Sequence, residues 1–420
     1  MIVEFSVGNF RSIKDLQTIN LAAASITSKY SETDESNVSK VSDKMSLLKS
    51  KAIYGANASG KSNFIKALLA FKILVDRSVK EETTLGLFIE PFYLNETALQ
   101  LPSFFQLIFV VDGITYRYGF EATRKEITAE WLFGTPGKKE VFFFTREKDK
   151  MKVNAAKFPE GSKISDLGGK NGIVRSNALF LTVVRSFNGK LSKRLTDYIM
   201  NIAIISGMTD ARLYDLAKAA LGQDEMREKI AGILKLADTG IEDINVLDLD
   251  TGEWAISNPA KSEKNKVILS WHTRYNELNE EVAPVHMLWD VTESDGTKKI
   301  FEISPLLLVA LEEGYPVFID EFDARLHPLL TRKILELFNT VNNKNAQLIF
   351  VTHDINLLSA KLLRRDQISF VEKDKYGCTS MYSLVDFKGI RNDASFDKDY
   401  MQGKYGAIPF LNEFISAFED

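Results

Sequence analysis

The stretch that decides the fold is KAIYGANASGKS, residues 51–62. Its second part, GANASGKS (55–62), fits the pattern GxxxxGK[ST] in full, with strand-forming residues before it and the helix-forming run NFIKALLAFKILVD (63–76) after it. In such a loop glycines let the backbone wrap closely around phosphate oxygens, while successive N–H groups and the helix N-terminus supply positive potential. Because strand and helix are both in place, a chance Gly/Ser-rich loop is the weaker explanation. The sequence therefore predicts a P-loop.

The P-loop prediction gives each residue of the motif a role. The residues expected to bind the nucleotide here are Gly55, Asn57, Ser59, Gly60, Lys61 and Ser62. Lys61 would reach the β- and γ-phosphates, and Ser62 would ligate Mg²⁺. We therefore expect ATP and Mg²⁺ as ligands.

An acidic pair ends a second apolar run, PVFIDE, residues 316–321. Buried parallel strands read as apolar runs, and ligands bind at the carboxyl ends of such strands. Asp320 would hold Mg²⁺, directly or through water, and Glu321 would act as the general base toward the attacking water. The alternative is a pair of solvated acids in a turn.

A third apolar run, AQLIFVTHD (346–354), places His353 at its carboxyl end. If the strands are neighbours and parallel, this imidazole lies near the γ-phosphate, where it can sense or stabilise developing charge. A lone histidine is more often structural, and only the setting favours a role for His353. His327, which precedes a proline, is typical of a turn.

Composition narrows the class of protein. The chain has 420 residues, 45% of them hydrophobic and 11% aromatic, enough for a sizeable core of two or three lobes. Lys and Arg number 53 against 57 Asp and Glu, a net charge of −4, which argues against a surface that coats nucleic acid throughout. With one cysteine, Cys378, no signal-peptide pattern and no apolar run long enough to span a bilayer, we expect a cytoplasmic protein without membrane contact.

The texture of the sequence changes along the chain. Loose alternation over 2–20 predicts a short hairpin, and the Ser-, Asp- and Lys-rich residues 25–46 predict an exposed connection. The patterns that follow predict an antiparallel sheet over 88–155, helices over 175–240, short strands over 242–290 and parallel α/β structure from 293 onward. The predicted domains are a first ATPase lobe (1–155), a mainly helical insertion suited to oligomer or partner contacts (156–290) and a second lobe (291–420).

The segment ESDGTKK (293–299) opens the second lobe directly before an apolar helix. Backbone N–H groups at a helix N-terminus preceded by Ser-x-Gly can bind an anion. A chain with its own P-loop needs a second phosphate site only if two chains dimerise head-to-tail, each donating this loop to the other's ATP. A serine helix cap explains the segment equally well.

Taken together, GANASGKS, ESDGTKK, PVFIDEFDARLHP (316–328) and VTHD (351–354) resemble, in that order, the ABC-type ATPase heads of the RecF/SMC/OLD group. The segments VGNFRSIKD (7–15) and KDYMQGKYGAIPF (398–410) are similar to those of the AAA15 subgroup. These are RloA-like ATPases of bacterial anti-phage operons, and they include the ATPase subunits of PARIS-type systems.

The resemblance implies an α/β fold: an ABC-type head of the P-loop NTPase class, with an antiparallel β subdomain and a mostly helical insertion. It implies a homodimer or higher homo-oligomer closed through an ATP sandwich, in which Ser294 and Gly296 contact the partner's γ-phosphate. Asp323 would be the D-loop residue, His353 the switch histidine, and Arg11 would lie near the nucleotide. The segment departs from an LSGGQ-like signature at Asp295 and at 297–298. The Q-loop glutamine has no clear position, and Gln106 is a weak candidate.

Two classes of function remain open. The first is an ATP-driven sensor and scaffold that controls a separately encoded effector, a TOPRIM-type or other nuclease or a toxin. The second is a RecF-like clamp that binds duplex DNA in repair; the basic clusters KSEKNK (261–266) and LLRR (362–365) are short and mixed with acids, so charge does not indicate DNA. The sequence shows no long heptad run and no Cys-x-x-Cys hook, which argues against a DNA tether. The segment after His353 is short for a nuclease domain, so we do not expect a built-in nuclease. A non-hydrolysing structural subunit would have no need of Glu321.

Overall fold

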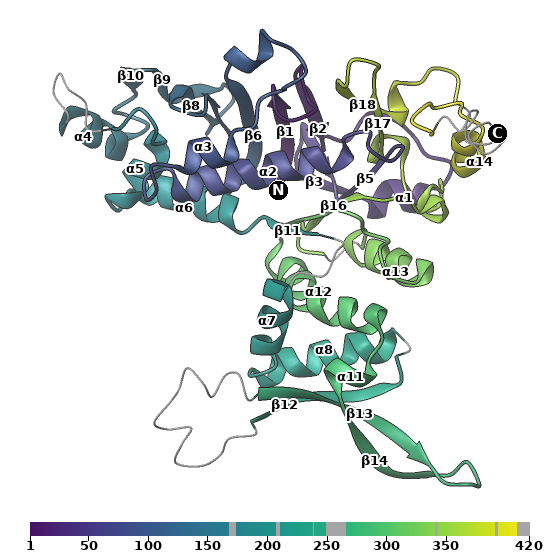
Figure 1. The fold of residues 1–420 in the computed structure, drawn as a ribbon. Coiled ribbons are helices and arrows are strands. Elements are labelled where there is room, and N and C mark those ends of the chain that lie inside the picture. Colours follow the sequence, from purple (N-terminus) through teal and green to yellow (C-terminus); the bar gives the residue numbers. More distant parts are fainter. Residues whose placement is uncertain are drawn as a thin grey trace, which may run out of the picture. The chain divides into compact units, whose positions relative to one another are not determined.

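The structure is a computed structural model that describes residues 1–167, 174–206, 211–237, 239–248, 266–340, 343–390 and 394–409 (Figure 1). Its chain forms two compact units. Unit 1 comprises Met1–Ile204, Gly314–Asp320 and Leu335–Asp420, and unit 2 comprises Ile205–Glu313 and Glu321–Ile334. The three domains predicted from the sequence were drawn where the residue pattern changes, whereas these two units are groups of residues in spatial contact. The predicted boundaries therefore stay a prediction.

Unit 1 contains a seven-stranded antiparallel sheet in the order β10-β9-β8-β7-β6-β1-β2. Its strands are β1 (Ile2–Gly8), β2 (Gln17–Asn20), β6 (Ser103–Val111), β7 (Ile114–Ala122), β8 (Ile127–Thr135), β9 (Val141–Glu147) and β10 (Lys150–Val153). Burial alternates along β6, as a sheet with one face on the core requires. The predicted hairpin and antiparallel sheet are confirmed, but the sheet begins at 103 because a short helix, α3 (Thr84–Phe88), and a 3-10 turn (Ala98–Gln100) come first.

A second sheet of six strands carries the parallel α/β core predicted for the last lobe. Its order is β11-β15-β16-β5-β17-β18, formed by β11 (Ala203–Ile205), β15 (Pro316–Ile319), β16 (Gln347–Val351), β5 (Ser50–Tyr54), β17 (Ile368–Lys373) and β18 (Thr379–Ser383). The pairs β15–β16, β16–β5 and β5–β17 are parallel, and β17–β18 is antiparallel. Every residue of β5, β15 and β16 is buried, which explains the apolar runs 52–54, 316–319 and 348–351 within them.

The exposed connection predicted over 25–46 is only partly right. This segment holds the short helix α1 (Ser31–Ser36) and the strand β3 (Val38–Ser42), which pairs with β4 (Met45–Leu48). The hairpin forms because Val38 pairs with Leu48, an apolar residue beyond the polar run, and Leu47 and Leu48 are buried. The Ser- and Lys-rich composition hid this pairing.

Of the helices of unit 1, α3, α5 and α6 contact α2, which runs from the P-loop across the unit (Figure 1). The helix bounds are α2 (Lys61–Arg77), α4 (Pro159–Leu167), α5 (Phe180–Ser186), α6 (Lys190–Met200) and α14 (Phe396–Met401), and short 3-10 turns occupy 355–357, 365–367 and 384–386. Phe71 of α2 stacks on Phe120 of the antiparallel sheet with ring centroids 5.4 Å apart. Gln347 joins the two sheets, because its side chain bonds both backbone groups of Ile2 and the carbonyl of Leu48. The P-loop helix is thereby fixed to one continuous core.

In its described residues, unit 2 combines helices with a three-stranded antiparallel sheet in the order β12-β13-β14. Its elements are α7 (Ala211–Ala220), α8 (Asp224–Leu236), β12 (Ile241–Asp248), β13 (Lys266–Tyr275), β14 (Glu281–Leu288), α11 (Trp289–Thr292) and α12 (Asp295–Glu313), and α13 (Pro328–Phe338) begins in this unit. The fully buried Trp289 packs against Phe301 of α12, with ring centroids 4.8 Å apart. The predicted helices over 175–240 are confirmed within the described residues except at 203–205, which form the edge strand β11, and the predicted strands over 242–290 are confirmed.

Membrane insertion has no support among the helices of the described ranges. None of them combines the length and the apolar character that crossing a bilayer requires.

Candidate functional site

The carboxyl ends of three parallel strands meet at one edge of the six-stranded sheet. In the ladder Ile319 pairs with Phe350, and Val351 pairs with Ile53, so the ends of β15, β16 and β5 are level. The residues that follow these ends are the P-loop, Asp320 and the Thr352–His353 pair. This edge is where parallel α/β sheets bind their ligands.

The P-loop adopts a conformation that depends on glycine. Gly60, the residue before α2, has φ +104°, a backbone conformation that L side chains rarely adopt. The buried Lys61 turns back over the loop, where its Nζ donates hydrogen bonds of 2.8 Å to the carbonyls of Gly55 and Ala56. The ammonium group is therefore held above the loop that would wrap the phosphates.

The loop has spare hydrogen-bonding capacity that fits an anionic ligand. Among the described residues, the backbone N–H groups of Asn57, Ala58 and Gly60 find no acceptor. The Oγ of Ser59 is buried and likewise has no hydrogen-bond partner within the described ranges. Buried polar groups are normally satisfied, so these orphan groups beside a helix N-terminus fit the phosphates of a nucleotide.

A pair of oxygen groups beside the loop fits Mg²⁺. Ser62 Oγ donates a hydrogen bond of 3.1 Å to Asp320 Oδ1. No cluster of three or more His, Cys, Asp or Glu side chains that could enclose a metal occurs in the part of the chain that the structure describes. Mg²⁺ is commonly bound by one or two protein oxygens together with phosphates and water, and a hydroxyl beside a carboxylate suits that mode.

Three further residues hold the P-loop and were not predicted from the sequence. Thr379, the first residue of β18, donates from Oγ1 to the carbonyl of Ser59 at 2.9 Å. Ser12 Oγ lies 2.7 Å from Thr379 Oγ1 and accepts a hydrogen bond of 2.6 Å from Asn63 Nδ2. The segment VGNFRSIKD (7–15) was expected to approach the nucleotide through Arg11, whereas the contact with the P-loop region comes from Ser12 of the same segment.

Arg11 and Gln106 have partners elsewhere in unit 1. The guanidinium of Arg11 donates from Nε and Nη2 to Glu90 Oε1, at 3.1 and 2.8 Å. Gln106 lies within β6, and its Oε1 accepts a hydrogen bond from Trp131 Nε1 at 3.1 Å. A role of Arg11 at the nucleotide thus stays a prediction, and Gln106 is engaged in the antiparallel sheet.

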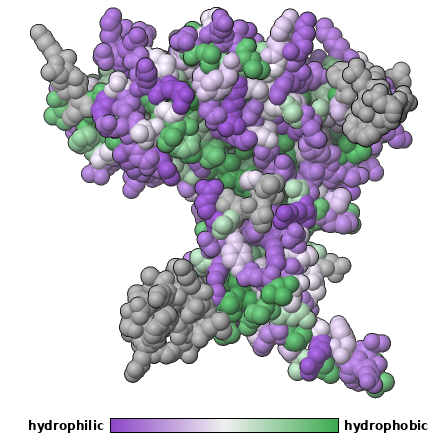
Figure 2. Space-filling view, in the orientation of Figure 1, coloured by the Kyte–Doolittle hydropathy of each residue, from purple (hydrophilic) through white to green (hydrophobic). Residues whose placement is uncertain are grey.

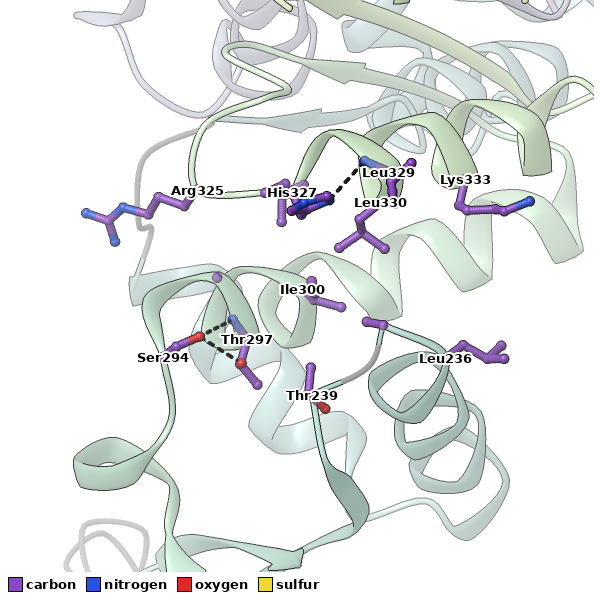
Figure 3. A pocket seen from close by; sticks show the side chains of 13 residues that line it. Leu236, Thr239, Ser294, Thr297, Ile300, Arg325, His327, Leu329, Leu330 and Lys333 are labelled. Carbon is purple, nitrogen blue, oxygen red and sulfur yellow. Dashed lines mark hydrogen bonds between the residues drawn. The ribbon is translucent and has the colours of Figure 1, made fainter. Parts of the chain in front are cut away.

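In unit 2, the ESDGTKK segment forms the start of α12 (Figure 3). Ser294 Oγ accepts a hydrogen bond of 3.2 Å from Thr297 N and lies 2.9 Å from Thr297 Oγ1, so it caps the helix. A Cβ at Gly296 would lie 2.8 Å from the carbonyl oxygen of Arg325, so only glycine allows this close approach. The Arg325 side chain in turn lies 3.5 Å from Asp295. The segment is therefore a capped helix start fastened to the 323–327 segment.

This helix start borders a cavity of about 570 Å³ within unit 2 (Figure 3). Basic and apolar side chains line it, among them Arg325, His327, Lys333, Ile300 and Leu330. His327 accepts a hydrogen bond of 3.2 Å at Nδ1 from the backbone N–H of Leu329. Its carbonyl accepts from the N–H groups of Leu330 and Thr331, so the residue predicted to lie in a turn is instead the cap of α13.

The predicted residues divide between the two units. Gly55, Asn57, Ser59, Gly60, Lys61, Ser62, Asp320, His353 and Arg11 belong to unit 1, and Glu321, Asp323, Ser294 and Gly296 belong to unit 2. His353 and Glu321 are exposed, and Glu321 adopts a φ of +51°, which is unusual for a residue with a side chain. Unit 1 thus gathers the residues predicted to bind phosphate and metal, and unit 2 gathers the residues predicted to complete the site.

Comparison with known proteins adds a family and a set of folds. The family model described as "AAA domain, putative AbiEii toxin, Type IV TA system" matches residues 52–359. No curated protein is similar enough to count as a match.

Three solved SMC heads are similar at low identity. The SMC head domain from Thermotoga maritima is 13% identical over 91% of this chain and 98% of that chain, with a TM-score of 0.41. An SMC head bound to the C-winged helix domain of ScpA is also 13% identical, covering 91% and 97%, with a TM-score of 0.46. An SMC head with an extended coiled coil bound to the C-terminal domain of ScpA, derived from Pyrococcus furiosus, is 12% identical, covering 91% and 96%, with a TM-score of 0.38.

Proposed function

Since the chain belongs to the AAA-domain family whose description names a putative AbiEii toxin of a Type IV TA system, we propose that it is an ATP-hydrolysing sensor and scaffold of a bacterial anti-phage system. In this proposal it controls a separately encoded effector, a nuclease of TOPRIM or another type, or a toxin. The observation that carries the ATPase part is the 3.1 Å hydrogen bond between Ser62 and Asp320 beside a complete P-loop. That pair has the chemistry of a Mg·ATP site.

Each residue of unit 1 has a defined task in this proposal. The N–H groups of the loop and the ammonium of Lys61 bind the phosphates, and Ser62 and Asp320 hold the metal. When bound, Mg²⁺ neutralises negative charge on the phosphate oxygens. Glu321 orients and deprotonates the attacking water, and His353, at the end of β16, responds to the γ-phosphate.

Closure of the site requires a second copy of the chain. Ser294 and Gly296 of one copy would contact the γ-phosphate held by the other, Asp323 would line the same interface, and Arg11 would approach the nucleotide. The N-terminus of α12 supplies positive potential for this contact. ATP binding would therefore drive the formation of a dimer, from which higher oligomers can build.

The effector-controlling role draws on the family description and on the surface of unit 2. The family description names a toxin, which fits a defence operon and the AAA15 or RloA-like subgroup. Apolar residues gather on the visible face of the described part of unit 2 (Figure 2). Independently of that view, the exposed apolar side chains of unit 2 include Leu216, Leu236 and Val291. Exposed apolar patches mark contact surfaces for partners.

A RecF-like clamp on duplex DNA is the alternative function, and one basic cluster can be examined in the structure. Arg364 of the 362–365 cluster is only 4% exposed and forms ion pairs with Asp34 and Asp366. Because the Arg364 guanidinium is buried and paired with two carboxylates, it cannot contact a DNA phosphate. The cluster at 261–266 lies outside the described residues except for Lys266.

The test uses Glu321→Gln, which should bind ATP without turning it over and so accumulate the closed assembly. Mass photometry with Mg·ATP, with and without duplex DNA, measures assembly, and release of inorganic phosphate measures turnover. Glu277→Gln, an exposed glutamate of the same unit, is the matched control. A pull-down with the products of neighbouring genes identifies the effector.

The outcomes separate the two functions. Assembly without DNA that retains a co-encoded effector supports the sensor, whereas assembly that requires DNA and retains no partner supports the clamp. Phosphate release by Glu321→Gln at the wild-type rate would show that another group is the base.

A further inference from the structure

A chain of side-chain hydrogen bonds ends on the backbone of the P-loop. It links Asn63 Nδ2 to Ser12 Oγ at 2.6 Å, Ser12 Oγ to Thr379 Oγ1 at 2.7 Å, and Thr379 Oγ1 to the carbonyl of Ser59 at 2.9 Å. Its members come from the first turn of α2, from the N-terminal loop and from the start of β18. The P-loop is thus held from outside by two segments that are remote in the sequence.

Elementary hydrogen-bond counting gives this chain a direction. A hydroxyl has one proton to donate, and a backbone carbonyl can only accept. Thr379 must therefore use its proton on the Ser59 carbonyl, and it must accept the proton of Ser12. Ser12 in turn accepts from the Asn63 amide. All donors point the same way, toward the Ser59 carbonyl, and such aligned chains strengthen each bond.

The Ser59 carbonyl controls where the next N–H group points. No cis peptide bond occurs among the described residues, so the Ser59 carbonyl and the Gly60 N–H point in opposite directions across their shared peptide plane. Glycine at 60 tolerates both orientations of that plane, because it has no Cβ. The loop alone therefore leaves the direction of the Gly60 N–H open.

We propose that Thr379 is a positioning residue that fixes the orientation of the Ser59–Gly60 peptide and so directs the Gly60 N–H toward the phosphates of the bound nucleotide. This inference rests on the proposed binding of ATP at the P-loop. Gly60 N–H finds no acceptor among the described residues, so it is available to a ligand. If the peptide flipped, the Ser59 carbonyl would face the phosphates instead, and two negative groups would oppose each other.

The surroundings of Thr379 keep its hydroxyl in place. Its backbone N–H donates to the carbonyl of Ser12 at 2.7 Å, and the residue is only 2% exposed. A Cβ at Gly60 would lie 2.2 Å from Thr379 Oγ1, so glycine at 60 and threonine at 379 fit each other sterically. Water has little access to replace the bond if the hydroxyl is removed.

The experiment compares Thr379→Val, which keeps the shape and removes the hydroxyl, with Thr379→Ser, which keeps the hydroxyl. Affinity is measured with a fluorescent ATP analogue and with ADP in the presence of Mg²⁺, together with KM and kcat for phosphate release and thermal unfolding without nucleotide. Thr18→Val is the matched control, because Thr18 Oγ1 also bonds a serine hydroxyl, that of Ser6 at 2.8 Å, but in the β1–β2 pair.

We expect Thr379→Val to bind both nucleotides about tenfold more weakly and to raise KM more than it lowers kcat, because a charge-assisted bond to phosphate is misaligned. Thr379→Ser and Thr18→Val should behave as wild type. Thr379→Val should unfold at a lower temperature without nucleotide, because the Ser59 carbonyl loses its hydrogen-bond partner, so all affinities are compared at a temperature at which every variant is folded. If Thr379→Val bound nucleotide with wild-type affinity, the role inferred for Thr379 would be wrong, but the proposed function would be unaffected. Failure of the wild-type protein itself to bind ATP would instead overturn the proposed function.

Discussion

The hydroxyl of Ser62 donates a 3.1 Å hydrogen bond to the carboxylate of Asp320, although 258 positions separate the two residues in the chain. The bond joins the first turn of α2 to the end of β15, so it holds the two predicted Mg²⁺ ligands side by side. Asp320→Asn keeps the shape and removes the charge. We expect it to weaken Mg²⁺-dependent ATP binding by at least about 100-fold, measured by titrating Mg²⁺ against a fluorescent ATP analogue.

Asp43→Asn is the control for this substitution, because Asp43 is almost fully exposed and pairs only with Lys40 among the described residues. It should leave the Mg²⁺ dependence unchanged. An Asp320→Asn protein with the wild-type Mg²⁺ midpoint would remove Asp320 from the metal site.

The acid Glu130 holds the helical segment of unit 1 to the antiparallel sheet. It is fully buried, and it accepts hydrogen bonds from the backbone N–H groups of Phe180 and Leu181 at 2.6 and 3.0 Å and from Tyr118 Oη at 3.1 Å, with Arg146 at 3.9 Å. Glu130→Ala leaves these donors buried without their acceptor. We expect the free energy of unfolding of unit 1 to fall by about 3–5 kcal/mol, measured by urea denaturation.

Glu130→Gln is the milder companion variant, since the amide oxygen can still accept one of these bonds. It should fall between Glu130→Ala and the wild type. If Glu130→Ala cost less than about 1 kcal/mol, the buried network would contribute little to the stability of unit 1.

In unit 2, Glu293 connects the sheet to the start of α12. Its carboxylate accepts a hydrogen bond of 2.6 Å from Ser270 Oγ and lies 2.9 Å from His272 Nε2, both on β13. Because Ser294, the cap of α12, is the next residue, Glu293→Gln should loosen β13 and the first turn of α12 together. We expect amide hydrogen exchange of both peptides to accelerate about tenfold, with the P-loop peptide unchanged.

Glu277→Gln, in the exposed turn between β13 and β14, serves again as the matched control. Exchange that accelerates equally in both variants would show a general loosening of the sheet. No acceleration in Glu293→Gln would mean that Glu293 does not connect the sheet to the helix.

The strands of the nucleotide site could be predicted because each one is recognisable from its own short stretch of sequence. AIY, PVFI and LIFV are apolar runs, and the polar residues that follow them meet at one sheet edge once the strands are parallel and level. The P-loop motif also predicts the start of its helix, which begins at Lys61. Asp320 could therefore be placed beside Ser62 without any knowledge of the strand order.

The residues that hold the loop from outside could not be predicted. Thr379 and Ser12 act through single hydroxyl groups, which are common in loops and strands and have no distinctive spacing. Their contacts depend on β18 pairing with β17 at the far side of β5, and no local pattern encodes that order. Likewise, the Ser294–Thr297 cap of α12 was one of two explanations of ESDGTKK, and only the side-chain geometry shows it.

The last prediction concerns Lys51, a buried lysine of β5 whose Nζ donates to the carbonyl of Asp366 at 2.8 Å. Burial lowers the pKa of Lys51 from 10.5 to about 8, although Asp366 and Asp386 oppose the shift. Between pH 10.5 and 8 the unfolded chain therefore takes up a proton that the folded chain does not, so stability falls as the pH falls through this window and changes no further below it. From pH 9.5 to 8 this amounts to about 1–2 kcal/mol, measurable as a shift in the urea midpoint. Lys51→Met should reduce that dependence, while Lys40→Met, at a largely exposed position, should retain it. Equal pH slopes in the two variants would mean that Lys51 is solvated and titrates normally.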